Sequence, residues 1–214
     1  MFDAAKARRL MVDGQVRVAD VTSPELLSAM LEVPREQFVA AAQREQAYYD
    51  AEIEIAKGRV LLRPMVLGKL IQALRVEPHD KVLDVGGGLG YSSALLARLA
   101  GSVVALEQDG IAPRAQAALA GTANVSVVSG PLAAGWPPQA PYDVILVNGA
   151  VEFLPDSFAA QIAPTGRLAC IRRDGAASKA MLYRLAEEKL VGRSIFDAWA
   201  PILPGFERPP AFVF

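Results

Sequence analysis

The chain has 214 residues, of which 52% are hydrophobic, and it carries 22 basic and 23 acidic side chains. This length suits one compact domain with an added lobe, and the near-zero net charge argues against a polyanionic partner such as nucleic acid. One cysteine, Cys170, and one histidine, His79, argue against an internal disulfide and a histidine- or cysteine-ligated metal, so we expect no metal. Without a signal-like N-terminus or a membrane-length apolar run, we expect a soluble, cytoplasmic protein.

The first part of the chain predicts a helical lobe. Residues from about 3 to 40 have the composition and spacing of two helices, and the second begins with Ser23 as its cap and Pro24 in its first turn. Residues 48–58 predict an irregular connection with a turn at Gly58, and a helix follows from Pro64 to Leu74. We therefore divide the chain into a helical lobe with a substrate loop, residues 1–64, and an α/β domain, residues 65–214, that together form one compact unit.

A glycine-rich turn after a short apolar strand is the most informative feature of the sequence. Residues 82–91 read Val-Leu-Asp-Val-Gly-Gly-Gly-Leu-Gly-Tyr, with Asp84, Gly86, Gly88 and Gly90 at alternate positions. This spacing is typical of S-adenosylmethionine (SAM) sites, whereas a dinucleotide fingerprint would place a glycine where Tyr91 stands. Glu107 ends the next apolar strand, where a carboxylate can accept both ribose hydroxyls. A glycine turn that binds nothing is the alternative interpretation.

The remaining segments alternate between strands and helices up to residue 171. The patterns predict a helix over 113–120, strands over 124–128 and 142–149, a helix over 154–162 and a strand over 166–171. Residues 177–188 fit either a helix or one strand of an antiparallel pair, and 193–199 and 211–214 are short strand candidates. The fold class predicted is α/β: a doubly wound, mostly parallel sheet of the Rossmann-like SAM-dependent methyltransferase type with an N-terminal helical lobe.

Several short motifs, in their order along the chain, resemble one known family. The matching segments are Met11–Gln15, Val33–Val39, Ala47–Asp50, Val82–Tyr91, Gly135–Pro137 and Ala140–Asp143. Together they resemble the protein-L-isoaspartate O-methyltransferase family over nearly the whole chain. The resemblance implies a SAM-dependent methyltransferase that methylates the free carboxylate of isoaspartyl residues in damaged proteins, which starts their repair. Its substrate would be a protein or peptide carboxylate, and the oligomeric state stays open.

The resemblance also implies roles for particular residues. The cofactor-binding candidates are Asp84, Gly86, Gly88, Gly90, Glu107, Gln108, Gly130 and Pro131, and the substrate-loop candidates are Arg59, Leu62, Arg63 and Pro64. Leu62 stands where the family has a serine beside the methyl-transfer site, so no catalytic residue is assigned. Pro131 replaces an aspartate that approaches the adenine.

Two consequences follow from these departures. Val60 and Leu62 would give the substrate loop an apolar rim, which Arg59 or Arg63 would offset by meeting an acidic substrate. Two other functions therefore stay open for this chain: transfer to a different acceptor, and a non-catalytic sensor or binding module.

Overall fold

A mixed seven-stranded sheet forms the centre of the molecule in the computed structural model, which describes residues 2–208. Its strand order is β5-β4-β3-β6-β7-β8-β9. The five strands from β5 to β7 run parallel, whereas β8 and β9 join as an antiparallel meander. The bounds are β3 (Lys81–Val85), β4 (Ser102–Glu107), β5 (Val125–Ser129), β6 (Tyr142–Val151), β7 (Ile162–Asp174), β8 (Ala177–Ala186) and β9 (Lys189–Asp197).

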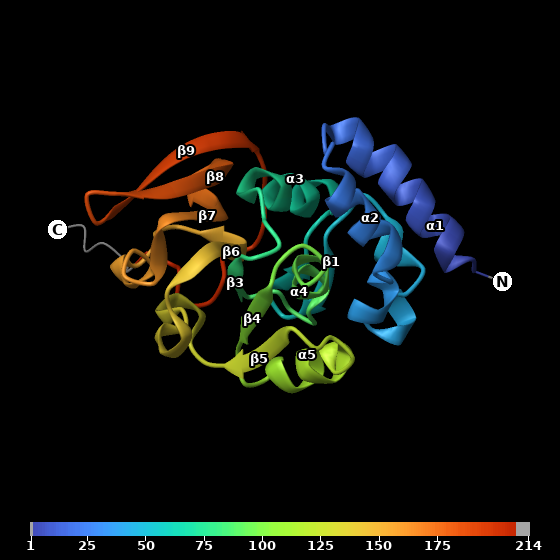
Figure 1. Cartoon of the computed structure of the whole chain (residues 1–214). Coiled ribbons are helices and arrows are strands. Elements are labelled where there is room, and N and C mark those ends of the chain that lie inside the picture. The colour runs from blue at the N-terminus through green and yellow to red at the C-terminus, as the bar shows by residue number, and fades with distance from the viewer. Residues whose placement is uncertain (1, 209–214) are drawn as a thin grey trace.

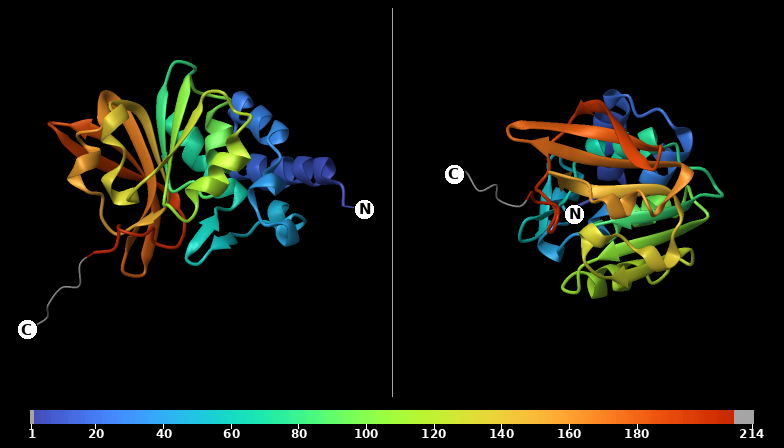
Figure 2. Two further views of the ribbon diagram at one scale, coloured as in Figure 1. Left: turned by 90° about the horizontal axis from the view of Figure 1, so that it is seen from below. Right: turned by 90° about the vertical axis from the view of Figure 1, so that its left-hand side faces the viewer.

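One face of the sheet is covered by helices and by the N-terminal lobe (Figures 1 and 2). The helices are α3 (Pro64–Leu74), α4 (Tyr91–Leu96) and α5 (Ala112–Leu119). The helices predicted over Pro64–Leu74 and over 113–120 are confirmed, α3 with the predicted bounds. Their apolar side chains share one core with alternate residues of the strands, such as Val82, Val144 and Ala169, because neighbouring strand residues point to opposite faces.

The other face is covered by short 3₁₀ turns and by the segment that follows β9. The turns are Leu132–Ala134, Pro137–Gln139 and Asp156–Phe158. The helix predicted over 154–162 is therefore wrong. The backbone of Gln161 already pairs with β6, since its carbonyl accepts from Tyr142 N at 2.9 Å, and β7 begins at Ile162 rather than at residue 166. Only one short turn fits before the chain becomes a strand.

The N-terminal lobe contains the two predicted helices. Helix α1 (Ala4–Met11) continues through a π turn, Val12–Val16, and a 3₁₀ turn, Arg17–Ala19, and helix α2 spans Pro24–Glu32. The Ser23 side chain accepts from Leu26 N at 3.3 Å, which confirms the predicted cap. Three 3₁₀ turns follow, at Arg35–Phe38, Ala41–Gln43 and Gln46–Tyr48, and the lobe packs through α2 against α3 and α4.

A small β-hairpin joins the lobe to the sheet. Strands β1 (Ile53–Ala56) and β2 (Arg59–Leu61) pair antiparallel around a turn at Lys57 and Gly58. The turn at Gly58 was predicted, but the irregular connection around it was wrong. Since each strand has four residues or fewer, the hairpin depends on packing of Ile53 and Leu61, which are both buried.

The C-terminal region settles the alternatives left open by its sequence. Residues 177–186 form a strand, β8, paired with β7 and with β9, so the antiparallel alternative is correct. After β9 the chain returns to the carboxyl end of β6, where Ile202 bridges to Ala150 and Leu203 packs into the core. The strand candidate at 211–214 lies outside the described residues. Within residues 2–208, no helix has the length and apolar character needed to span a membrane.

Candidate functional site

The carboxyl ends of β3 and β4 bring the glycine turn and Glu107 together. The two strands pair in parallel, and Gly86 N donates to Leu106 O at 2.9 Å across their ends. Gly88 N then donates to the Glu107 carboxylate at 2.7 Å. The structure thus places side by side two features that lie 19 residues apart in the sequence.

Glycine is required in this turn for two reasons. Gly86 and Gly88 have φ values of +74° and +66°, which side chains rarely adopt. A Cβ atom at Gly88 would also lie 2.2 Å from Ile55 Cδ1 of the β1–β2 hairpin. The turn is therefore both left-handed and tightly covered.

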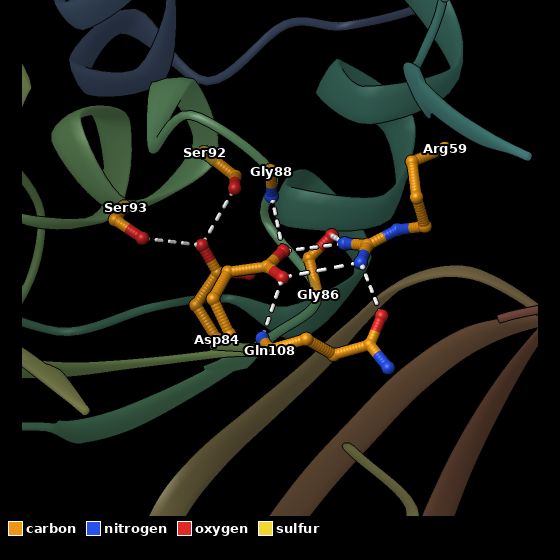
Figure 3. A network of polar contacts seen from close by, with 8 residues as sticks. Arg59, Asp84, Gly86, Gly88, Ser92, Ser93 and Gln108 are labelled. Atoms are coloured by element: carbon orange, nitrogen blue, oxygen red, sulfur yellow. Dashed lines mark hydrogen bonds and ion pairs between the residues drawn. The ribbon is translucent and has the colours of Figure 1, made fainter. Parts of the chain in front are cut away.

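Asp84 is a buried carboxylate directly below the glycine turn (Figure 3). The hydroxyl groups of Ser92 and Ser93, at the start of α4, each donate to its Oδ2 at 2.6 Å. Its Oδ1 has no hydrogen-bond partner among residues 2–208. Burial raises the pKa of Asp84 to about 6, partly offset by the two hydroxyl groups, and the nearby Glu107 adds to the rise. The glycine motif did not reveal the two serines, which occupy ordinary helix positions.

Glu107 is also buried, and its carboxylate is held by four N–H groups. Arg59 Nη1 donates to Oε2 at 3.1 Å, and Arg59 Nη2 forms an ion pair with Oε1. The other two donors are the backbone amides of Gly88 and Gln108. Figure 3 shows the Arg59 guanidinium beside Gly86 and the side chain of Gln108.

Arg59 does not have the environment that the sequence suggested. Its side chain is 3% exposed, so it does not face an external acidic group in this structure. Besides Glu107, it donates to Gly86 O at 2.9 Å and to the side chain of Gln108 at 3.3 Å. The expectation that Arg59 lies open to an acidic substrate is corrected, because the β1–β2 hairpin turns this side chain inward.

The other substrate-loop candidates divide between core and surface. Leu62 is 1% exposed, and Pro64 is buried in the first turn of α3. The apolar rim predicted for this loop is therefore wrong at Leu62, whose side chain lies in the core. Arg63 is exposed and pairs with Glu52, with 2.9 Å between Nε and Oε1. Arg63 is the substrate-loop candidate that carries a charge at the surface.

Arg35 supports this loop from inside the lobe, a role that its motif did not reveal. It is fully buried, and it donates to the carbonyls of Ala47 at 2.6 Å and Leu62 at 2.7 Å. Its guanidinium also lies over the ring of Tyr91, 4.8 Å from the ring centre. Burial lowers the pKa of Arg35. Arg35 thus ties the substrate loop to the first residue of α4.

Gly130 and Pro131 follow β5, the next strand in the sheet. Gly130 N donates to the backbone carbonyl of Glu107 at 2.9 Å, so this turn adjoins the end of β4. Pro131 is exposed and begins a 3₁₀ turn. Trp136 packs against Gly130 and the core of the second sheet face. The structure therefore brings Gly130 to the site edge through its backbone.

A glycine turn after one parallel strand, with a buried carboxylate ending the next, defines the α/β proteins that bind nucleoside ligands at this sheet edge. The comparisons then give the family. A model of the family "Protein-L-isoaspartate(D-aspartate) O-methyltransferase" matches residues 7–193. The chain belongs to this family, and the family expected from the sequence is confirmed.

Relatives with known names agree with the family model. Protein-L-isoaspartate O-methyltransferase 1 of Rhodopseudomonas palustris is 41% identical over 77% of this chain and 68% of its own length. Protein-L-isoaspartate O-methyltransferase of Methylorubrum populi is 35% identical over 96% of this chain and 98% of its own length. The similarity therefore extends over the lobe, the site and the C-terminal strands.

Solved structures support the fold. One titled protein-L-isoaspartate O-methyltransferase superposes with a TM-score of 0.80 at 24% identity, over 95% of this chain and 66% of that one. A second, a putative enzyme of this kind from Plasmodium falciparum in complex with S-adenosyl-L-homocysteine, gives 0.79 at 15% identity, over 95% and 99%. The predicted methyltransferase fold class is confirmed, except that 3₁₀ turns rather than α-helices cover one sheet face.

Proposed function

We propose that this chain is a SAM-dependent methyltransferase that transfers a methyl group to the carboxylate of isoaspartyl residues in proteins. The observation that carries the proposal is the buried Glu107 carboxylate beside the Gly86–Gly88 turn, in a chain matched by the family model over residues 7–193. Protein or peptide substrates follow from the family, and a cytoplasmic location stays a prediction.

The residues present fit SAM in their chemistry. Glu107 offers a carboxylate for the ribose hydroxyls, and the glycine turn lets a ligand approach the backbone closely. The Oδ1 of Asp84, which has no hydrogen-bond partner in the described part of the chain, and the side chain of Gln108 add further polar groups at this sheet edge. Gly130 and Pro131 border the adjoining edge, where they would flank the base. When bound, SAM supplies an electrophilic methyl group.

The acceptor chemistry needs little from the protein beyond orientation. A carboxylate is already ionised at neutral pH, so this reaction requires no general base, and holding the two reactants in line is the main contribution of the site. Arg63 is the exposed cation of the substrate loop, and we assign it to attract the acidic acceptor. Leu62 stands where the family has a serine, so a hydroxyl group is missing here. Because Leu62 is buried, it adds no apolar surface that would favour a different acceptor.

Methyl transfer from labelled SAM to an isoaspartyl peptide and to its aspartyl twin tests the assignment. We expect label on the isoaspartyl peptide alone, and base-labile release of that label, because the product is a methyl ester. The assay is run at saturating SAM and repeated with the Arg59→Gln variant. Equal labelling of both peptides, or none with either protein, would contradict the proposal.

A further inference from the structure

The Arg59 side chain donates hydrogen bonds to the acceptor groups of the candidate cofactor site. Its guanidinium contacts both Glu107 oxygens and donates to Gly86 O at 2.9 Å. Arg59 and Glu107 are 3% and 2% exposed. A buried ion pair thus joins the N-terminal lobe to Glu107, the carboxylate that the proposed function assigns to the ribose.

The geometry leaves Glu107 little capacity for another ligand. Two backbone amides and two guanidinium N–H groups already donate to its two oxygens. The amides belong to the framework of the turn, so a ribose hydroxyl gains a place on this carboxylate only by replacing Arg59.

Two apolar contacts also cover the glycine turn while Arg59 is paired with Glu107. Ile55, from the partner strand of the hairpin that carries Arg59, packs on Gly88, where a Cβ would lie 2.2 Å from its Cδ1. Leu203, from the segment after β9, packs on Gly86 from the C-terminal side. Hairpin and C-terminal segment therefore both cover the glycine turn.

We propose that Arg59 is an internal competitor of the cofactor: SAM reaches Glu107 only when the guanidinium leaves and the β1–β2 hairpin lifts from Gly88. This proposal rests on the proposed function for the identity of the ligand. Because only the open fraction of molecules binds, the apparent dissociation constant exceeds the intrinsic one by the inverse of that fraction. Arg59 thus sets cofactor affinity.

Calorimetric titration with S-adenosylhomocysteine tests the proposal, since this product binds without turnover. We compare wild type, Arg59→Gln, and Arg167→Gln as a matched control. Arg167 also pairs with a buried carboxylate, Asp80, but its other partners are the carbonyls of Leu74, Arg75 and Asp143, at the end of the sheet opposite the glycine turn. The control therefore loses an arginine that pairs with a buried carboxylate, without opening the site.

We expect Arg59→Gln to bind S-adenosylhomocysteine at least tenfold more tightly than wild type, and Arg167→Gln to bind like wild type. Ile55→Ala provides a second route, because it loosens the hairpin while keeping the ion pair; we expect a several-fold gain from it. An unchanged or weaker affinity in Arg59→Gln, including no binding at all, would overturn the proposal. If Arg59→Gln does not fold, the result for Ile55→Ala decides in the same way.

The outcome separates this proposal from the proposed function. Tighter binding in Arg59→Gln, with no labelling of the isoaspartyl peptide by any protein, would leave the internal competitor standing and remove the acceptor assignment. Selective labelling of the isoaspartyl peptide, with equal affinities in wild type and Arg59→Gln, would keep the acceptor assignment and remove the internal competitor.

Discussion

Asp84 and Glu107 are two buried carboxylates on adjacent strands, and the protein holds them in different ways. Glu107 receives a guanidinium and two amides, whereas Asp84 receives two hydroxyl groups and has no cationic partner among residues 2–208. A charge that lacks a cationic partner pays more of its desolvation cost, so the neutral form of Asp84 is favoured and its pKa rises to about 6. Asp84 is therefore a residue that takes up a proton on mild acidification.

This shift predicts a pH dependence of stability. The pKa of Asp84 is 3.8 in the unfolded chain and about 6 in the folded one, so folding favours the protonated form and stability is lost as pH rises between these values. A difference of about two pH units corresponds to about 3 kcal/mol. Asn does not titrate, so Asp84→Asn does not lose this free energy of unfolding as the pH rises. We expect the free energy of unfolding of Asp84→Asn, relative to that of wild type, to be larger at pH 7 than at pH 4 by that amount, measured by urea unfolding.

A control separates this effect from a general loss of charge. Asp50→Asn also removes one carboxylate, but at an exposed position, so the difference between its free energy of unfolding and that of wild type should change little over the same pH range. A difference between Asp84→Asn and wild type that stays constant with pH would contradict the interpretation.

Helix α2 and the β1–β2 hairpin both connect the lobe to the site, but they differ in how they are held. Helix α2 begins with a side-chain cap and packs against α3 and α4, so its start sets how the lobe lies on the sheet. The hairpin, by contrast, is too short to form alone and is held through Ile55, Arg59 and buried neighbours. This difference is consistent with the proposed opening, in which the hairpin moves while α2 keeps the lobe in place.

The cap of α2 gives a prediction at this scale. Ser23→Ala leaves the Leu26 amide without its acceptor, and we expect a loss of about 1 kcal/mol in the free energy of unfolding. Ser28→Ala is the matched control, because Ser28 is exposed in the same helix and its hydroxyl donates to Glu32 rather than to a backbone group; its effect should stay below about 0.5 kcal/mol. Equal losses in the two variants by denaturant titration would show that capping is not the cause.

Arg167 links several elements at the end of the sheet opposite the site. From β7 it pairs with Asp80 ahead of β3, at 2.6 Å, and donates to Leu74 O and Arg75 O at the end of α3, both also at 2.6 Å. These bonds connect the first helix of the α/β region with two of its central strands. Since Asp80 is 2% exposed, losing the guanidinium would leave a buried charge without its cationic partner and with the Glu77 amide as a remaining donor.

Loss of the Arg167 side chain should destabilise the whole molecule. We expect Arg167→Gln to lower the free energy of unfolding by about 3 kcal/mol, as removal of one partner from a buried pair does. Arg98→Gln, which breaks an exposed pair with Glu32, should cost less than about 1 kcal/mol. Thermal and urea unfolding of both variants check this ranking, and similar losses would refute it.

The sequence by itself determined the parallel core of the sheet, the helix cap at Ser23 and the meeting of the glycine turn with Glu107. Each follows from short-range patterns: apolar strands, a capping residue, and the rule that successive parallel strands end at the same edge. The family motifs were equally local, which is why they were readable from one chain.

Only the tertiary structure decided which side chain meets Glu107. Arg59 lies 48 residues earlier, and the contact depends on a hairpin whose strands are too short to be recognised without their packing. Leu62 was placed on a rim by its neighbours in sequence, yet the loop geometry turns it into the core. The helix expected over 154–162 gave way to sheet pairing at Gln161, because long-range hydrogen bonds outweigh local helix preference.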